Sequence, residues 1–156
     1  MRNLLLTFIA LILSVAQLQA QADSIAKATV NITAKNDSVY AIQVTVQVQA
    51  GWKIYDANAE GVEAPHLKFT LETAVALNPP NYSVVAQAQK DVLFGNAKVF
   101  TGQFDITEDI VIHGFQPDSL KGVVVLSAGK ESSFYVIELP IVMPLANGQK
   151  GTQFSI

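Results

Sequence analysis

Apolar and polar residues alternate with a period of two along most of the chain after residue 23, and this pattern constrains the fold most strongly. Residues 28–34 alternate in this way, and so do residues 42–48. Between them, Asn36-Asp37 is typical of a tight turn. The two stretches therefore predict a β-hairpin with one buried face.

Further stretches with a strand pattern follow to residue 141. They are residues 67–71, 100–106, 110–112, 123–126 and 137–141. Within residues 100–106, Phe100, Phe104 and Ile106 are expected on one face of a single strand, whereas the continuous run Val123–Leu126 is typical of a strand buried on both faces. Because no convincing helical period occurs after the first 22 residues, we predict an all-β fold, an immunoglobulin-like antiparallel β-sandwich of about seven to nine strands.

The first 22 residues have the order of a secretory signal peptide. A short basic start is followed by the apolar run Leu4–Ala16, and Ala20 and Ala22 offer small-residue cleavage positions. The apolar run is shorter than the ~20 residues that span a bilayer, which favours cleavage over a membrane anchor. We therefore predict a signal peptide over 1–22, one domain over 23–146, a loose C-terminal tail over 147–156, and a periplasmic or secreted location without a membrane span after cleavage.

The mature chain is mildly acidic and contains no cysteine. After loss of Arg2, nine basic residues face thirteen acidic ones, a net charge of about −4. This balance, without a basic cluster, argues against nucleic acid and anionic membrane surfaces as partners. Export places a protein where disulfides persist, but a chain without thiols cannot form one or bind a metal through a thiolate.

Residues with catalytic or metal-binding chemistry are sparse. His66 and His113 are the only histidines and are assigned to different strands at the surface, too few for a metal site. The acidic pairs in residues 60–63 and at Glu108-Asp109 are assigned to solvated loops, because the dense ligand spacing of a calcium loop is absent. No nucleophile elbow or phosphate-binding loop occurs. The residues therefore predict no enzyme, no metal and no cofactor.

Three motifs in a fixed order suggest a family. Residues Gly51-Trp52-Lys53-Ile54-Tyr55 end the second strand, Ala64-Pro65 precede the next, and Asp91-Val92-Leu93-Phe94-Gly95 form a later loop. Residues 98–104 follow that loop closely. In this order and spacing, the chain from Ser24 to Leu145 resembles the N-terminal domain of the thiol:disulfide interchange protein DsbD, also labelled a disulfide bond corrector domain.

The resemblance implies a periplasmic immunoglobulin-like domain that passes electrons from the membrane part of DsbD to other thiol proteins. In that family, a cap loop with an aromatic residue shields two cysteines near a hairpin. By resemblance the cap loop is Asp91–Gly95, with Phe94 as the capping aromatic, Leu93 in place of a second aromatic and Val92 where some members have an acid. The hairpin matches residues 126–134, and Ala128 (or Ser127) and Ser133 fill the cysteine positions.

These replacements predict a non-enzymatic relative, because serine and alanine cannot take part in disulfide exchange. The surface around the cap loop and the former cysteine hairpin is then expected to bind a protein. The candidate binding residues are Asp91, Leu93, Phe94, Ala128, Ser133, Trp52 and Tyr55. Trp52 is expected to cover one end of the core and Tyr55 to pack with its hydroxyl at the rim. Gly95 and Gly129 are expected to serve turns.

Three functional hypotheses stay open at this point. The first is an exported interaction module that binds another envelope protein. The second is a docking accessory of a thiol-redox or cytochrome-maturation pathway, with a periplasmic thioredoxin-like or DsbD-like partner. The third is a structural or adhesive envelope sandwich. An exposed Phe94 favours binding, whereas a buried Phe94 beside a flat polar hairpin argues against it.

Overall fold

The computed structural model describes residues 25–57 and 61–145 and the backbone of residues 152–155. It contains the following strands: β1 (Ala26–Ala34), β2 (Val39–Val48), β3 (Lys53–Tyr55), β4 (His66–Phe69), β5 (Ala74–Ala76), β6 (Asn81–Tyr82), β7 (Gln87–Asp91), β8 (Gly95–Phe100), β9 (Gln103–Ile112), β10 (Ser119–Lys130), β11 (Ser133–Pro144) and β12 (Thr152–Ser155). The predicted signal peptide lies outside the described residues.

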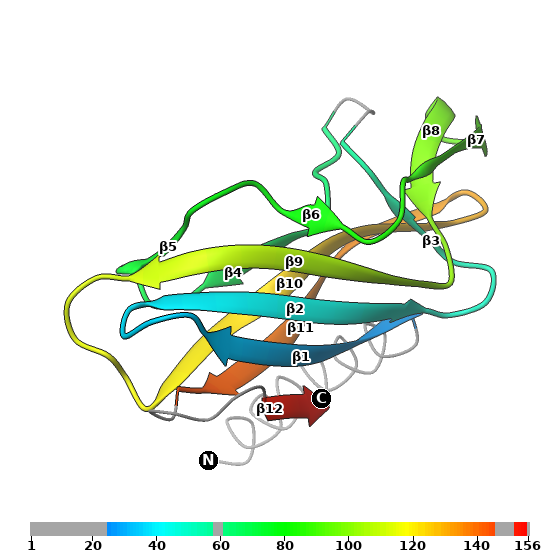
Figure 1. Ribbon diagram of the computed structural model, residues 1–156. Helices are drawn as coiled ribbons and strands as arrows, with labels where there is room; N and C mark the ends of the chain where they lie inside the picture. Colours follow the sequence, from blue (N-terminus) through cyan, green and yellow to red (C-terminus); the bar gives the residue numbers. More distant parts are fainter. Residues whose placement is uncertain (1–24, 58–60, 146–151, 156) are drawn as a thin grey trace, which may run out of the picture.

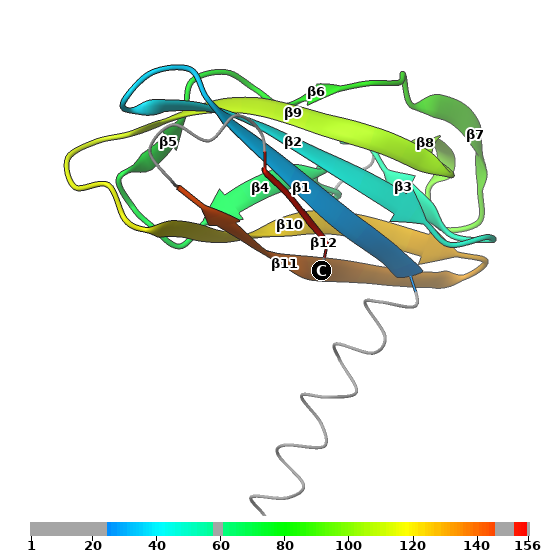
Figure 2. The same ribbon diagram turned by 60° about the horizontal axis from the view of Figure 1, so that its bottom comes forward.

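Two antiparallel sheets form the two layers of a sandwich (Figures 1 and 2). The first sheet has the strand order β12-β1-β2-β9-β5, with β6 also paired to β9, and the second has the order β11-β10-β3-β8-β7, with β4 paired to β10. The predicted all-β immunoglobulin-like sandwich is therefore confirmed. The described residues form twelve strand segments, more than expected, because short segments such as β5 and β6 pair with β9 at the rim of the first sheet.

The first two strands form the predicted hairpin. Strands β1 and β2 pair in antiparallel register, with Val30 opposite Val44. The carboxamide oxygen of Asn36 accepts hydrogen bonds from the backbone nitrogens of Ser38 (3.0 Å) and Val39 (2.9 Å), which closes the turn. An asparagine side chain that bonds its own backbone in this way explains why the turn forms here.

The prediction that Phe100 and Phe104 belong to one strand is wrong. Strand β8 ends at Phe100 in the second sheet, and β9 begins at Gln103 in the first. Gly102, with a φ of 70°, forms part of the turn that carries the chain from one sheet to the other. Both rings still point into the core and stack with their centroids 4.5 Å apart, so the alternation continues although the strand does not.

The longest hairpin, β10–β11, forms one side of the second sheet, with β11 as the edge strand. In the continuous apolar run, Val124, Val125 and Leu126 are buried and Val123 is half-buried, so β10 is buried on both faces over most of this run. On β11, Ile137, Leu139 and Ile141 are buried, as their alternation predicted.

The C-terminal end is not entirely a loose tail. The backbone of residues 152–155 forms β12, which pairs antiparallel with β1 from Ile32↔Thr152 to Thr29↔Ser155. This pairing covers an edge of β1 that would otherwise present free backbone groups. Within the described part of the chain, there is no helix of the length and apolarity that a membrane span requires.

Candidate functional site

The predicted cap loop is organised around the buried carboxylate of Asp91, the last residue of β7. One carboxylate oxygen accepts a hydrogen bond from the Tyr55 hydroxyl (2.8 Å) and also pairs with the ammonium group of Lys53. The other oxygen accepts hydrogen bonds from the backbone nitrogens of Leu93 (2.8 Å) and Phe94 (3.0 Å). The side chain of Asp91 has no exposed surface, and both of its oxygens are bonded.

These hydrogen bonds shift the pKa values of the Asp91 carboxyl and the Tyr55 hydroxyl. Burial by itself would raise the pKa of the Asp91 carboxyl, but the hydrogen bonds from Lys53, Tyr55 and the two backbone amides outweigh it and lower the pKa to about 2. Burial, and then the bond to Asp91, raises the pKa of the Tyr55 hydroxyl well above its ordinary value. Asp91 is therefore a constant negative charge near neutral pH.

The local sequence explains the shape of the cap loop. An aspartate that accepts bonds from the amides two and three residues further along closes a tight turn. Gly95 completes it with a φ of 73°, a conformation that glycine adopts without strain, so the predicted turn role of Gly95 is confirmed. The ion pair then ties the turn to β3, on a neighbouring part of the sheet.

Phe94 folds back into an aromatic cluster and is only partly exposed. Its ring centroid lies 5.1 Å from that of Tyr55 in an edge-to-face arrangement and 5.7 Å from that of Phe134. Val62 and Val99 are buried in the same cluster. Tyr55 itself is fully buried, so the expectation of a hydroxyl at the rim is wrong: its hydroxyl points inward to Asp91.

Gly129 lies within β10 and not in a turn, contrary to the prediction. A Cβ atom at this position would lie 2.6 Å from the Cε2 atom of Tyr55 and would also overlap its hydroxyl. The glycine is needed because the tyrosine ring packs directly on the backbone of β10.

The residues at the positions that the resemblance assigns to cysteines are not neighbours across the hairpin. Ala128 is fully buried and is paired with Tyr135, whereas Ser133 is exposed and is paired with Lys130. The alternative residue, Ser127, is buried and is paired with Val136. The structure thus brings together Tyr55, Asp91 and the cap loop, but leaves these hairpin positions apart.

Trp52 lies on the other side of the second sheet from Tyr55. It is half-buried against the main core, and its ring centroid lies 5.9 Å from that of Tyr135. The expectation that Trp52 covers one end of the core is therefore confirmed. Because residues three apart on a strand face opposite sides, Trp52 and Tyr55 do not share a surface.

Exposed apolar side chains accompany the aromatic cluster, both in the cap loop and on β11. Val92 is 78% exposed, Leu93 is 40% exposed and Val136 is 60% exposed. Val92 and Leu93 precede the half-buried Phe94, and Val136 lies two residues after Phe134, on the same side of β11. We refer to these five residues as the cap-loop face.

Two residues of this region have no role in the sequence prediction. Lys53 belongs to the motif over residues 51–55, and its spacing of two from Tyr55 places both side chains on one side of β3. Phe134 stands at the end of the hairpin motif, and its contact with Phe94 depends on how β10 and β11 pair.

No group of three or more potential metal ligands occurs within residues 25–57 and 61–145. His66 on β4 lies 3.7 Å from the carboxylate of Glu63 and bonds the carbonyl oxygen of Ala64 (2.9 Å), while His113 follows β9 and is exposed.

The assignment of Glu108-Asp109 to a solvated loop is wrong. Both residues lie within β9, where the period of two from Phe104 to Ile112 continues and turns Glu108 toward the core. Glu108 is 6% exposed, and its Oε2 atom is buried without a hydrogen-bond partner. Burial raises the pKa of its carboxyl to about 7, although the charge of His66 opposes this shift. Asp109 faces outward and pairs with Lys35 (2.6 Å).

No protein-family model and no curated protein matches this chain. Among solved structures, the N-terminal periplasmic domain of ScsB from Proteus mirabilis aligns with 76% of this chain at 18% identity with a TM-score of 0.58, and this chain spans only 47% of that chain. The reduced N-terminal domain of DsbD from Neisseria meningitidis aligns over 82% of this chain and 89% of its own, at 14% identity with a TM-score of 0.55. The chain therefore has the fold of the N-terminal domains of ScsB and DsbD, which confirms the resemblance at the level of the fold.

Proposed function

We propose that this chain is an exported, non-enzymatic protein-interaction module that binds another envelope protein through the cap-loop face. The exposure of Val92, Leu93 and Val136 around the rings of Phe94 and Phe134 carries the proposal. Grouped apolar side chains at the surface of a small domain are typical of a binding site for another protein. The Asp91 network below them holds the loop in one conformation, which lowers the entropy lost on binding.

The chemistry of this region supports a role without catalysis. The chain has no cysteine, so it cannot exchange disulfides in the way that the resemblance implies for its family. The charged groups of the cap loop are also engaged, since Asp91 accepts bonds at both oxygens and Lys53 is paired with it. We therefore expect the purified mature chain to reduce oxidised thiol proteins no faster than a blank without protein; activity above the blank would contradict the proposal.

Export follows from the predicted signal peptide over residues 1–22. The similar domains of ScsB and DsbD support a periplasmic location, since the structure of the former is described as periplasmic. The resemblance further suggests a thioredoxin-like or DsbD-like partner. A docking accessory of a thiol-redox pathway is therefore the more specific form of this proposal.

Binding can be tested with purified proteins. The mature chain is titrated by calorimetry with a periplasmic thioredoxin-fold protein and, separately, with the thiol-containing domains of a DsbD from the same cell. Val92→Asp and Val136→Asp should each weaken binding at least about tenfold, because each places a charge in an apolar contact. Val85→Asp is the matched control, because Val85 is 79% exposed in the segment between β6 and β7, away from the cap loop.

The outcomes separate the hypotheses. Binding that is lost in the Val92 and Val136 variants and kept in the Val85 variant supports the cap-loop face. Equal binding by all four proteins shows that the partner uses another surface. If the chain binds neither class of thiol protein, the redox-linked form of the proposal is wrong and the structural or adhesive alternative is favoured.

A further inference from the structure

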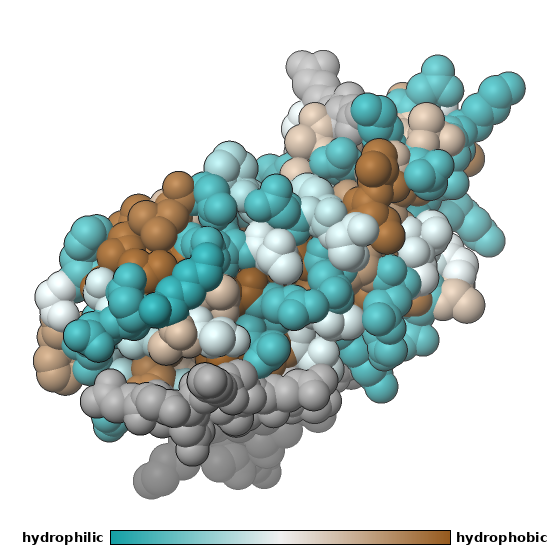
Figure 3. All heavy atoms as spheres, in the orientation of Figure 1, coloured by the Kyte–Doolittle hydropathy of each residue, from teal (hydrophilic) through white to brown (hydrophobic). Residues whose placement is uncertain are grey.

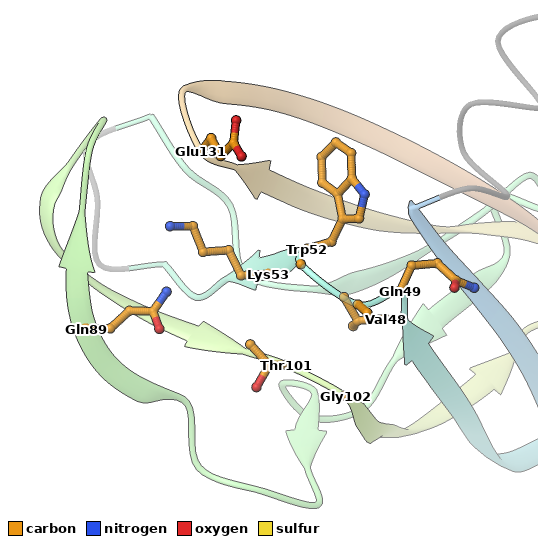
Figure 4. Close-up of a pocket in the computed structure, with 10 residues that line it drawn as sticks. Val48, Gln49, Trp52, Lys53, Gln89, Thr101, Gly102 and Glu131 are labelled. Atoms are coloured by element: carbon orange, nitrogen blue, oxygen red, sulfur yellow. The ribbon is translucent and has the colours of Figure 1, made fainter.

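A cavity of about 500 Å³ opens beside the hairpin tip, separate from the cap-loop face. Its lining comes from the end of β2 and the turn before β3, from β7, from the β8–β9 turn and from the β10–β11 turn (Figure 4). Its volume lies within the range of small-molecule sites. The lining residues with chemically informative side chains are Gln49, Trp52, Lys53, Gln89, Thr101 and Glu131.

The backbone at this cavity is unusual. Glu131 has a φ of 53°, and no other non-glycine residue in the described part of the chain has a positive φ. It is the first central residue of the two-residue turn between β10 and β11, a position that favours glycine. A strained residue that persists at the wall of a cavity points to a function for its side chain. The side chain here supplies a carboxylate.

The charges around the cavity nearly cancel. Lys53 is the one basic residue in the lining, and its ammonium group is already paired with Asp91. The neighbouring Lys130, whose ammonium lies 5.7 Å from the Trp52 ring centroid, carries a charge opposite to that of Glu131. The charge of Lys53 is balanced by Asp91 and that of Lys130 by Glu131, which favours a ligand without net charge.

The remaining groups suit a ligand with many hydroxyls. Gln49 and Gln89 each offer two donors and an acceptor, Thr101 offers a hydroxyl, and Glu131 offers two acceptors. Trp52 lines the cavity as well, with its indole half-buried against the core and the ammonium group of Lys130 over its ring. In Figure 4, the side chains of Lys53 from β3 and Gln89 from β7 extend toward one another at one side of the space, and the indole of Trp52 points away from them.

We propose that this cavity binds a neutral saccharide of one or two rings, held by Gln89, Thr101 and Glu131 beside Trp52. The site does not depend on the cap-loop face, so it is independent of the proposed interaction function. A binding role for the carboxylate accounts for a glutamate at a turn position where glycine would be more stable.

Tryptophan fluorescence tests this site directly, because Trp52 is the only tryptophan in the chain. The mature chain is titrated with cellobiose and with N,N′-diacetylchitobiose into the millimolar range, and in parallel with the charged sugars glucuronic acid and glucosamine. We expect a saturable change in emission with at least one neutral disaccharide and weaker responses to both charged sugars. The same titration followed by amide NMR should shift the signals of Gly51 and Gly102.

Two variants locate the binding. Gln89→Ala and Glu131→Gly should each weaken it about tenfold, the effect of losing one good hydrogen bond. Gln87→Ala is the matched control, because Gln87 lies on β7 but outside the lining. Glu131→Gly should raise the melting temperature while it weakens binding, which excludes unfolding as the cause. Absence of a saturable response to either neutral disaccharide, equal responses in all variants, or tighter binding of a charged sugar would each overturn the proposal.

Discussion

At the scale of single residues, two buried carboxylates behave in opposite ways because their neighbours differ. Asp91 has a partner for each oxygen and stays ionised. Glu108 has an oxygen without a partner among apolar residues of β9, and its pKa is raised to about 7. Burial disfavours the charged form of both groups, and hydrogen bonds decide the outcome.

Asp91→Asn should destabilise the chain by about 3 kcal/mol, because the substitution leaves the ammonium group of Lys53 buried without its partner. The folded pKa of about 2 lies below the ordinary value of 3.8, so the contribution of Asp91 is complete above pH ~4 and is lost as the pH falls toward 2. Urea unfolding from pH 2 to pH 7 measures both effects. A variant that keeps the acid-dependent loss of stability of the wild type would show that Asp91 is not its source.

Glu108→Gln should remove a pH dependence of the opposite sign. Because the folded pKa of about 7 exceeds the ordinary value of 4.5, the native carboxyl keeps its proton when the unfolded one has lost it, and stability falls as the pH rises from about 4.5 to 7. The variant should therefore be more stable than the wild type at pH 8, by up to about 3 kcal/mol. Urea unfolding at pH 5 and pH 8 tests this, with Glu138→Gln, an exposed residue of β11, as the control. Equal pH dependence in wild type and Glu108→Gln would contradict it.

At the scale of elements, close packing of β3 on β10 positions the candidate site. Tyr55 fits between Gly129 of β10 and the cap loop, and its hydroxyl reaches Asp91 at the end of β7. The side chain of Tyr55 on β3 therefore contacts both β10 and β7. Figure 1 shows that β3, β7, β8 and the tip of the β10–β11 hairpin gather at one end of the sandwich.

Gly129→Ala should destabilise the chain by about 2 kcal/mol, because the new methyl group overlaps the ring of Tyr55. The two residues should also be coupled: in a Tyr55→Leu background the same change should cost less than in the wild type. A double-mutant cycle by urea unfolding measures this coupling. Additive effects would show that the overlap is relieved without moving Tyr55.

At the scale of the whole molecule, the sandwich protects one sheet edge and leaves apolar side chains elsewhere. Strand β12 covers β1. On the face shown in Figure 3, hydrophobic residues gather over β5 and between β6 and β7, where Leu77 and Val85 are exposed. The proposed function uses the cap-loop face and not Leu77 or Val85.

Deleting residues 146–156 should promote self-association, because β1 then presents an unpaired edge to a second copy. Light scattering coupled to size-exclusion chromatography should show a larger average mass that rises with protein concentration. A chain that lacks only Ile156 serves as the control. Identical masses for the two shortened chains would show that β12 does not protect this edge.

Much of the architecture could be predicted from the sequence because it depends on local pattern. The alternation in residues 28–48 and 137–141 is determined by which side chains share a strand face. The alternation does not reveal where a strand ends. Phe100 and Phe104 lie on strands of different sheets, yet both face inward and keep the period of two. Glu108 is a second case. Its acidic side chain suggests a solvated loop, but the alternation of β9 continues through it and turns it toward the core.

The sequence by itself determined that this chain forms a β-sandwich and cannot exchange disulfides, because alternation and the absence of cysteine are properties of the chain alone. Only the tertiary structure decided which groups meet. The bond between Tyr55 and Asp91 joins residues 36 positions apart, and its formation depends on how β3, β7 and β8 pair. The burial of Glu108, the need for glycine at 129 and the cavity beside Trp52 follow from the same long-range pairing, which no local pattern encodes.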